Sequence, residues 1–148
     1  MKKGVTMKLS TKSRYGTRLM LDLAEQNSES YVQLKEISER QGISLKYLEQ
    51  IMIPLKKARL VESSRGASGG YRLARPADKI SVDEIVYTLE AGKTLTRCEV
   101  HPESCERADW CAVRHLWKEA TQAMYDKLAE VRLSDLLSKN NHRRGKHP

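Results

Sequence analysis

The sequence predicts a mainly α-helical protein with one small β-hairpin, built as a winged helix-turn-helix domain and a long dimerisation helix. Two short helical patterns joined by a glycine-containing turn are followed directly by a glycine-rich hairpin pattern. An amphipathic pattern then runs from about residue 112 to 129. We expect the winged domain in residues 1–80, a capping helix, cysteine loop and dimerisation helix in residues 81–139, and a disordered tail in residues 140–148.

Charge is unevenly distributed along the chain. Residues 1–80 hold 16 Lys and Arg against 8 Asp and Glu, whereas residues 81–139 hold 8 against 11. A basic head joined to a mildly acidic body favours a polyanionic partner, although a solvated basic surface would give the same totals. No apolar run approaches the ~20 residues that span a bilayer, and we see no secretory segment. We therefore expect a cytoplasmic protein with no membrane partner.

Three helices are expected before residue 60. The first begins at Ser10, and the second covers residues 32–40 before a tight turn at Gly42. Ser44 is a suitable cap for the third helix, because its hydroxyl can accept a backbone N–H of the first turn. Pro54 lies inside this helix and removes one backbone hydrogen bond, which predicts a kink or an early end. The inward stripe of the third helix is expected to be Leu45, Leu48, Met52 and Leu55.

The opposite face of the third helix is the candidate for reading DNA bases. It carries Lys46, Tyr47, Gln50, Ile53 and Lys57, with Glu49 on its flank. Glutamine can pair with adenine, glutamate can accept from cytosine, and lysine can bind guanine or phosphate, so these residue types suit the major groove. An ordinary exposed helix face would have a similar composition.

A β-hairpin is expected directly after the third helix. Residues 60–63 and 71–74 are its strands, and three glycines between them favour a tight turn. In this position the hairpin is a wing, and Arg65 near its tip could enter a minor groove or bind a phosphate. Such glycines occur in any hairpin, so the prediction of a wing depends on the position of this segment directly after the third helix.

The second half of the chain predicts two further helices and a final helical turn. Residues 81–84 form a capping box that begins a helix through Glu90, and Gly92 ends it. The pattern at 112–129 has one apolar stripe, which is either a core face or a dimer seam. We favour the seam, because helix-turn-helix heads commonly read two half-sites as a two-fold dimer. One last turn is expected at residues 134–138.

All three cysteines lie in one segment between these helices. Six residues separate Cys98 from Cys105, five separate Cys105 from Cys111, and His115 follows on the long helix. Thiolates at this density are typical metal ligands, because each is a soft anionic donor. Cytosolic thiols are kept reduced and the number is odd, so structural disulfides are not favoured. Metal binding and redox sensing are the two remaining interpretations.

These segments together resemble the IscR-type iron-sulfur regulators, the family that includes NsrR and CymR. The likeness rests on MKLSTKSRYG (7–16), ISERQGISLKYLEQ (37–50), RGASGGY (65–71) and the cysteine triplet before the Leu-Trp pair. It implies a homodimeric winged-helix protein whose long helices cross over to the partner and which binds double-stranded DNA at a palindromic site. It also implies an iron-sulfur cluster on Cys98, Cys105 and Cys111.

By the same resemblance, Tyr47, Glu49 and Gln50 take the recognition-helix positions and Arg65 the wing position. Lys46 stands where the family usually has serine, which leaves the preferred base sequence open.

The resemblance is weaker around the fourth cluster ligand. The first cysteine gap is six residues instead of five, and Arg114 occupies the position of the family's histidine, with His115 one residue later. Arginine stays protonated and offers no lone pair. The aspartate that NsrR uses from the partner's first helix is replaced by Arg14. The candidates for the fourth ligand are therefore His115, His101, Asp109, Glu103 or a non-protein ligand.

The leading hypothesis is a transcription regulator whose DNA binding depends on an iron-sulfur cluster and which controls cluster assembly or iron and redox genes. The resemblance favours a 2Fe-2S cluster, while three cysteines with an open fourth position would also suit 4Fe-4S. One alternative keeps the DNA head but makes the loop a zinc site or a thiol switch. Another is an iron-sulfur carrier or scaffold. We do not expect an enzyme, because no base to activate a cysteine nucleophile is recognisable outside the loop.

Overall fold

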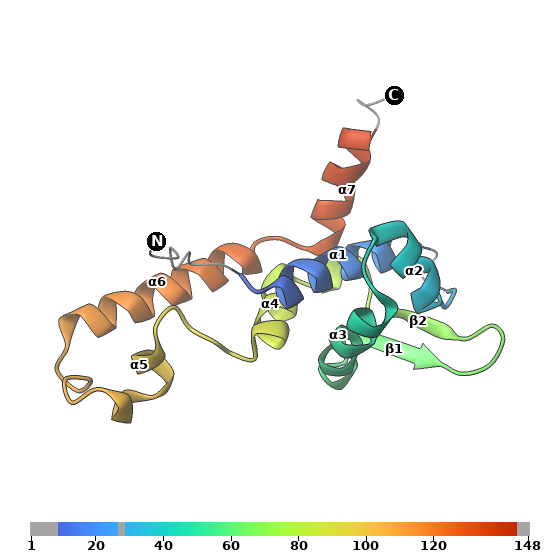
Figure 1. Cartoon of the computed structure of the whole chain (residues 1–148). Helices are drawn as coiled ribbons and strands as arrows, with labels where there is room; N and C mark the ends of the chain where they lie inside the picture. The colour runs from blue at the N-terminus through green and yellow to red at the C-terminus, as the bar shows by residue number, and fades with distance from the viewer. Residues whose placement is uncertain (1–8, 27–28, 145–148) are drawn as a thin grey trace, which may run out of the picture.

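The structure, a computed structural model, describes residues 9–26 and 29–144 and consists of a helical head and a long helical arm (Figure 1). The elements of the head are α1 (Thr11–Glu25), α2 (Leu34–Gln41), α3 (Leu45–Lys57), β1 (Val61–Ser64), β2 (Gly70–Leu73), a 3-10 turn (Ala77–Lys79) and α4 (Val82–Glu90). The prediction of a mainly α fold with a hairpin wing is confirmed.

The arm extends away from the wing and has the cysteine segment at its far end (Figure 1). Its elements are α5 (Arg97–Val100), a 3-10 turn (Pro102–Ser104) and α6 (Ala112–Ala129), after which α7 (Leu133–Arg144) packs against α1. The bounds of α6 agree with the sequence prediction. The short helix α5 was not predicted, although Thr96 and Glu99 form a capping box at its start.

The helix-turn-helix has the local signals that the sequence predicted. Gly42 ends α2 in the left-handed conformation with φ 64°. The Ser44 hydroxyl accepts a hydrogen bond from the Tyr47 backbone N–H at 3.2 Å and so caps α3. The second helix begins at Leu34 and not at residue 32, because Val32 pairs with Tyr71 through two backbone hydrogen bonds of 2.8 Å. This pairing attaches the start of α2 to the wing.

One expectation for α3 was wrong, and the early end that was one of two outcomes expected at Pro54 does not occur. Leu45, at the first position of the helix, is 41% exposed, whereas Ile51 is fully buried and completes the inward stripe. The helix also does not end at Pro54 but runs on to Lys57. The Pro54 carbonyl accepts the Ala58 backbone N–H at 2.9 Å, so the last turn remains hydrogen-bonded.

The wing is an antiparallel pair in which Val61 faces Leu73 and Ser64 faces Gly70. Each strand starts within one residue of its predicted position. Gly70 has φ 142°, and a Cβ built on it would lie 2.4 Å from the Val32 carbonyl oxygen. Any side chain here would therefore collide with the backbone that the wing pairs with.

Replacing Gly70 with alanine is expected to destabilise the protein by about 2 to 4 kcal/mol, because the new methyl group adds a backbone clash to an unfavourable φ. The measurement is urea unfolding. Gly42→Ala is the matched control, since Gly42 has positive φ but a Cβ added to it would have no atom within 4 Å. A Gly70→Ala variant no less stable than Gly42→Ala would contradict this account of the wing.

One hydrophobic core joins the head, α4 and the start of α7. Its fully buried side chains include Leu19, Ile37, Ile51 and Leu55 from the first three helices, and also Leu133. The backbone N–H of Leu133 donates to the Ile80 carbonyl at 3.0 Å, which fastens α7 to the head. The core thus contains residues from both sides of the boundary expected after residue 80.

The carboxyl end differs from the prediction. We expected one helical turn at residues 134–138 and a disordered tail from Asn140, but α7 continues to Arg144. The burial of Leu133 and a 2.7 Å hydrogen bond from the Asn140 amide to Glu25 Oε1 hold this polar helix against α1. Local sequence could not show this, because the stabilising contacts come from distant residues. The last four tail residues, 145–148, lie outside the described residues.

Candidate DNA interface and cysteine loop

The outward face of α3 presents a row of exposed polar side chains. Lys46, Glu49 and Gln50 are exposed, and Ile53 between them and the helix end is 70% exposed. These positions agree with the predicted recognition face. The apolar side of the same helix is held in the core by Leu48 and Ile51, which fixes the direction in which the polar side chains point.

Tyr47 differs from the other predicted reading residues, because its ring is partly packed into the head. It contacts Tyr15 of α1 edge-on, with ring centroids 5.9 Å apart. The guanidinium groups of Arg14 and Arg18 lie 5.8 Å and 5.4 Å from the centre of the Tyr15 ring. Tyr47 therefore both supports α3 and lies next to a cationic cluster on α1.

Four further basic residues, Arg14, Arg18, Lys56 and Arg59, were not among those predicted to contact DNA. Arg18 donates to the Gln41 carbonyl at 2.8 Å and so supports the turn between α2 and α3. Lys56 and Arg59 are exposed at the end of α3. Net charge was the available signal for these residues, and it could not rank one basic side chain above another.

The two arginines of the wing have different environments. Arg65 is exposed beyond the end of β1, and its side chain makes no hydrogen bond or ion pair with the part of the chain that the structure describes. Arg72 on β2 is bonded to Glu62 at 2.5 Å and to the Glu29 carbonyl at 3.4 Å, and it stacks 4.4 Å from the Tyr31 ring centre. Arg65 is available to a partner, whereas Arg72 is held at the wing.

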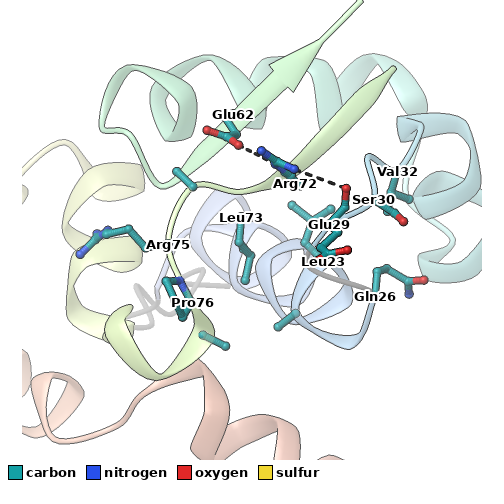
Figure 2. Close-up of a pocket in the computed structure, with 13 residues that line it drawn as sticks. Leu23, Gln26, Glu29, Ser30, Val32, Glu62, Arg72, Leu73, Arg75 and Pro76 are labelled. Carbon is teal, nitrogen blue, oxygen red and sulfur yellow. Dashed lines mark hydrogen bonds and ion pairs between the residues drawn. The ribbon is translucent and has the colours of Figure 1, made fainter. Parts of the chain in front are cut away.

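Figure 2 shows a hollow beside Arg72, between α1 and the base of the wing. Its volume is about 400 Å³, and its walls include Leu23, Val32 and Leu73. Arg75 also lines it but is bonded to Glu84 at 2.9 Å. Both arginines in the wall are therefore neutralised by carboxylates, and the described residues that line the hollow leave no free cation for an anionic ligand.

The cysteines lie on three successive pieces of the arm. Cys98 is half-buried on α5, and its Sγ lies 3.3 Å from the Thr96 hydroxyl oxygen. Cys105 directly follows the 3-10 turn and is exposed. Cys111 is half-buried at the amino end of α6, where it occupies the N-cap position. All three are free thiols.

Arg114 closes this loop. Its Nε donates to the Cys98 carbonyl at 2.9 Å, and its Nη1 donates to the Ala108 carbonyl at 3.3 Å. The guanidinium thus connects α5 and the middle of the loop to the first turn of α6. His115, the next residue, is exposed, as expected from a rotation of about 100° along the helix.

The other candidates for a fourth ligand are on the outside of the loop. His101 Nδ1 lies 3.0 Å from Glu103 Oε1, and both side chains are exposed. Hydrogen bonds from its own backbone and from His101 lower the pKa of Glu103. Asp109 is exposed as well.

The donor set suits an iron-sulfur cluster by its chemistry, because three thiolates from one loop are the usual protein ligands of such clusters. Among the described residues, no three His, Cys, Asp or Glu side chains converge closely enough to hold a single metal ion.

Comparison with known families decides the class of protein. A family model described as Rrf2, an iron-dependent transcriptional regulator, matches residues 9–139. The chain belongs to the Rrf2 family. Protein rrf2 of Nitratidesulfovibrio vulgaris is 47% identical to this Rrf2-family chain over 131 residues, which are 88% of this chain and 87% of that protein. The HTH-type transcriptional regulator IscR of Photorhabdus laumondii is 39% identical over 132 residues, or 89% and 80% of the two chains.

Solved structures agree with this assignment. T. potens IscR has a TM-score of 0.73 and 36% identity, with 90% of this chain and 88% of that chain covered. CymR, the global cysteine regulator of B. subtilis, has a TM-score of 0.70 and 37% identity, with 90% and 98% covered. The predicted resemblance is confirmed, and the Rrf2-family chain is a transcription regulator and not an enzyme. None of its described helices has the length and apolar character to cross a membrane.

Proposed function

We propose that this Rrf2-family regulator binds a specific palindromic DNA site as a homodimer, and that an iron-sulfur cluster on Cys98, Cys105 and Cys111 changes its DNA affinity. The observation that carries the proposal is the combination, in one chain, of an exposed recognition face on α3 and three free thiols in a loop closed by Arg114. We place it in the cytoplasm, where it would control genes of cluster assembly or iron and redox metabolism.

DNA would contact the head on the side of α3. Lys46, Glu49 and Gln50 reach base edges in the major groove, with Tyr47 beside them, while Arg65 reaches a phosphate or the minor groove. The absence of a partner for Arg65 among the described residues supports this role. Basic side chains at the edge of α3, such as Lys56, add sequence-independent attraction to phosphates.

A second copy of the chain would cover the apolar face of α6. Val113, Leu116 and Trp117 are 52%, 54% and 39% exposed, and they occur at the three- and four-residue spacing of one helix face. Large apolar side chains grouped in this way commonly mark an association surface. A two-fold dimer through the arms would present two heads to the two halves of a palindrome.

A short chain of contacts connects the loop to the head. The Leu95 backbone N–H donates to the Thr121 hydroxyl at 3.2 Å, just before the cysteine segment. Glu90, five residues earlier on α4, accepts from the Ser10 backbone N–H at 2.9 Å and from the Ser13 hydroxyl at the start of α1. Burial opposes the charge of Glu90, but these hydrogen bonds prevail and lower its pKa. A movement of the loop could therefore alter the position of α1.

When bound, the cluster would supply a redox-sensitive or labile group that favours one arrangement of the loop. The residues of the chain convert this preference into DNA affinity by linkage, with a coupling energy of about 1 to 3 kcal/mol. Arg114 keeps α5 near the start of α6, and Glu90 transmits the arrangement to α1.

The test compares cluster-loaded and cluster-free protein on the same DNA. We expect anaerobically isolated protein to show visible charge-transfer bands, and its affinity for a palindrome obtained by in vitro selection to differ about 5- to 150-fold from that of the cluster-free form. Fluorescence anisotropy over a range of salt concentrations measures both affinities. Equal affinities, or binding without any sequence preference, would contradict the proposal.

The exposure of Cys105 favours a second candidate, a regulator that senses oxidants through its thiols or holds zinc. Metal analysis separates this candidate from the first. One zinc per chain, or no metal at all, with a colourless protein after anaerobic reconstitution would favour it.

A further inference from the structure

Glu99 has an unusual environment for a carboxylate. Among the described residues, its Oε1 is the side-chain atom that is buried without any hydrogen-bond partner. The other oxygen, Oε2, accepts from the Thr96 backbone N–H at 2.8 Å and from the Thr96 hydroxyl at 3.0 Å. Burying a carboxylate oxygen without a donor or a cation is costly, so Oε1 is a position that favours a cationic partner.

The place of Glu99 in the loop suggests which partner that is. Glu99 follows Cys98 on α5, and the Cys98 carbonyl is held by Arg114 of α6. Arg114 is one helical turn beyond Cys111. The contacts of Arg114 therefore keep the Cys98 backbone, next to Glu99, close to the first turn of α6. That turn begins at Cys111, which is a second candidate ligand. Figure 1 shows α5 beside the outer half of α6.

We propose that Glu99 Oε1 is the fourth ligand of the iron-sulfur cluster, in the role that a histidine has in IscR-type proteins. This inference rests on the proposed function, because it requires that Cys98, Cys105 and Cys111 hold the cluster. The capping box fixes Oε2 and leaves Oε1 without a hydrogen bond, so Glu99 is oriented before any metal arrives.

The competing ligands are less well placed. Glu103 is exposed and hydrogen-bonded to His101. Asp109 and His115 are exposed, and His115 is one residue beyond the position from which Arg114 reaches the loop. Of the ionisable side chains in the loop, Glu99 alone combines burial of an oxygen atom with an unused lone pair.

The carboxylate would also change the charge of the site. Glutamate adds one negative charge compared with a neutral histidine, and net charge is one of the factors that set the reduction potential of a cluster. The fixed positive charge of Arg114, which donates to the Cys98 carbonyl, offsets part of it. The presence of arginine at the family's histidine position thus agrees with an anionic fourth ligand.

Glu99→Gln is the variant that tests the assignment. Glutamine can replace glutamate in a capping box, so the fold of α5 is kept while the anionic oxygen is lost. In anaerobically reconstituted full-length protein we expect the electron paramagnetic resonance g-values and the visible bands to shift, and the cluster to be lost to a chelator about 10- to 100-fold faster than from the wild type. Glu99→Cys should shift the bands again, toward an all-thiolate set.

Two controls separate a ligand from a structural role. Glu106→Gln makes the same chemical change at an exposed residue of the loop and should leave the spectra unchanged. Thr96→Ala removes the hydroxyl donor to Oε2 but keeps the Thr96 backbone N–H donor and the carboxylate. The Thr96 hydroxyl also lies 3.3 Å from Cys98 Sγ, so the readout for this control is cluster loss to the chelator, which should stay near the wild-type rate.

Three results would overturn the inference. If the wild type held a cluster and Glu99→Gln left its spectra unchanged, this inference alone would be overturned. It would also be overturned if Thr96→Ala lost the cluster to the chelator as fast as Glu99→Gln does. A wild-type protein that takes up no cluster would overturn the proposed function, and this inference with it.

Discussion

Replacing Cys105 with alanine is expected to abolish the visible absorption of the anaerobically isolated protein. Cys105 is the middle thiol of the three and the exposed one. Each iron needs its full set of ligands, and loss of a thiolate removes both a bond and the charge-transfer band that it produces. Because the side chain is exposed, the fold should not change, and the free energy of unfolding should stay within about 0.5 kcal/mol of the wild type.

Absorption spectra and iron content measure the effect, and circular dichroism checks the fold. His115→Ala is the comparison variant and should keep its bands, since His115 is exposed and one position away from Arg114. Cys98→Ala and Cys111→Ala should behave like Cys105→Ala. If Cys105→Ala kept the full visible spectrum, Cys105 would not be a cluster ligand, and the three cysteines would not form one ligand set.

The parts of the fold that sequence predicted well have short-range causes. Ser44 caps α3 and the Ser81–Glu84 pair caps α4, and each needs only residues within one turn. The bounds of α6 followed from an amphipathic pattern that continues without a helix breaker. The extent of α7 could not be predicted, because the burial of Leu133 and the contact of Asn140 depend on α1 and the 3-10 turn before α4.

The candidate site shows the same division. The spacing of Cys98, Cys105 and Cys111 indicated that they are candidate metal ligands. The exposure of Gln50 was predicted from the helical period. Sequence did not indicate that Arg114 closes the loop or that Glu99 has an unpaired oxygen, since both depend on contacts between segments. The Thr96–Glu99 capping box is a short-range signal from which the start of α5 could have been predicted.

Replacing Gln50 with alanine is expected to weaken binding to the selected palindrome by about 10- to 100-fold, because a bidentate side-chain contact with a base contributes about 1 to 3 kcal/mol. Gln50 is exposed on the face of α3 opposite the core, so its loss should not alter the stability of the head. Binding to DNA of random sequence should hardly change, since base contacts add specificity and phosphate contacts supply the general affinity.

Arg65→Ala should have a different effect, which makes the two variants a pair. Arg65 has no partner among the described residues, so if it contacts a phosphate its removal should lower affinity for all sequences and reduce the slope of log affinity against log salt by about one. Gln122→Ala, an exposed glutamine on α6 bonded to Asp126, is the control and should bind as the wild type does. Anisotropy titrations at several salt concentrations separate these outcomes. If Gln50→Ala weakened binding to the selected palindrome and to random DNA equally, Gln50 would contact a phosphate. The residues that recognise bases would then have to lie elsewhere on the head.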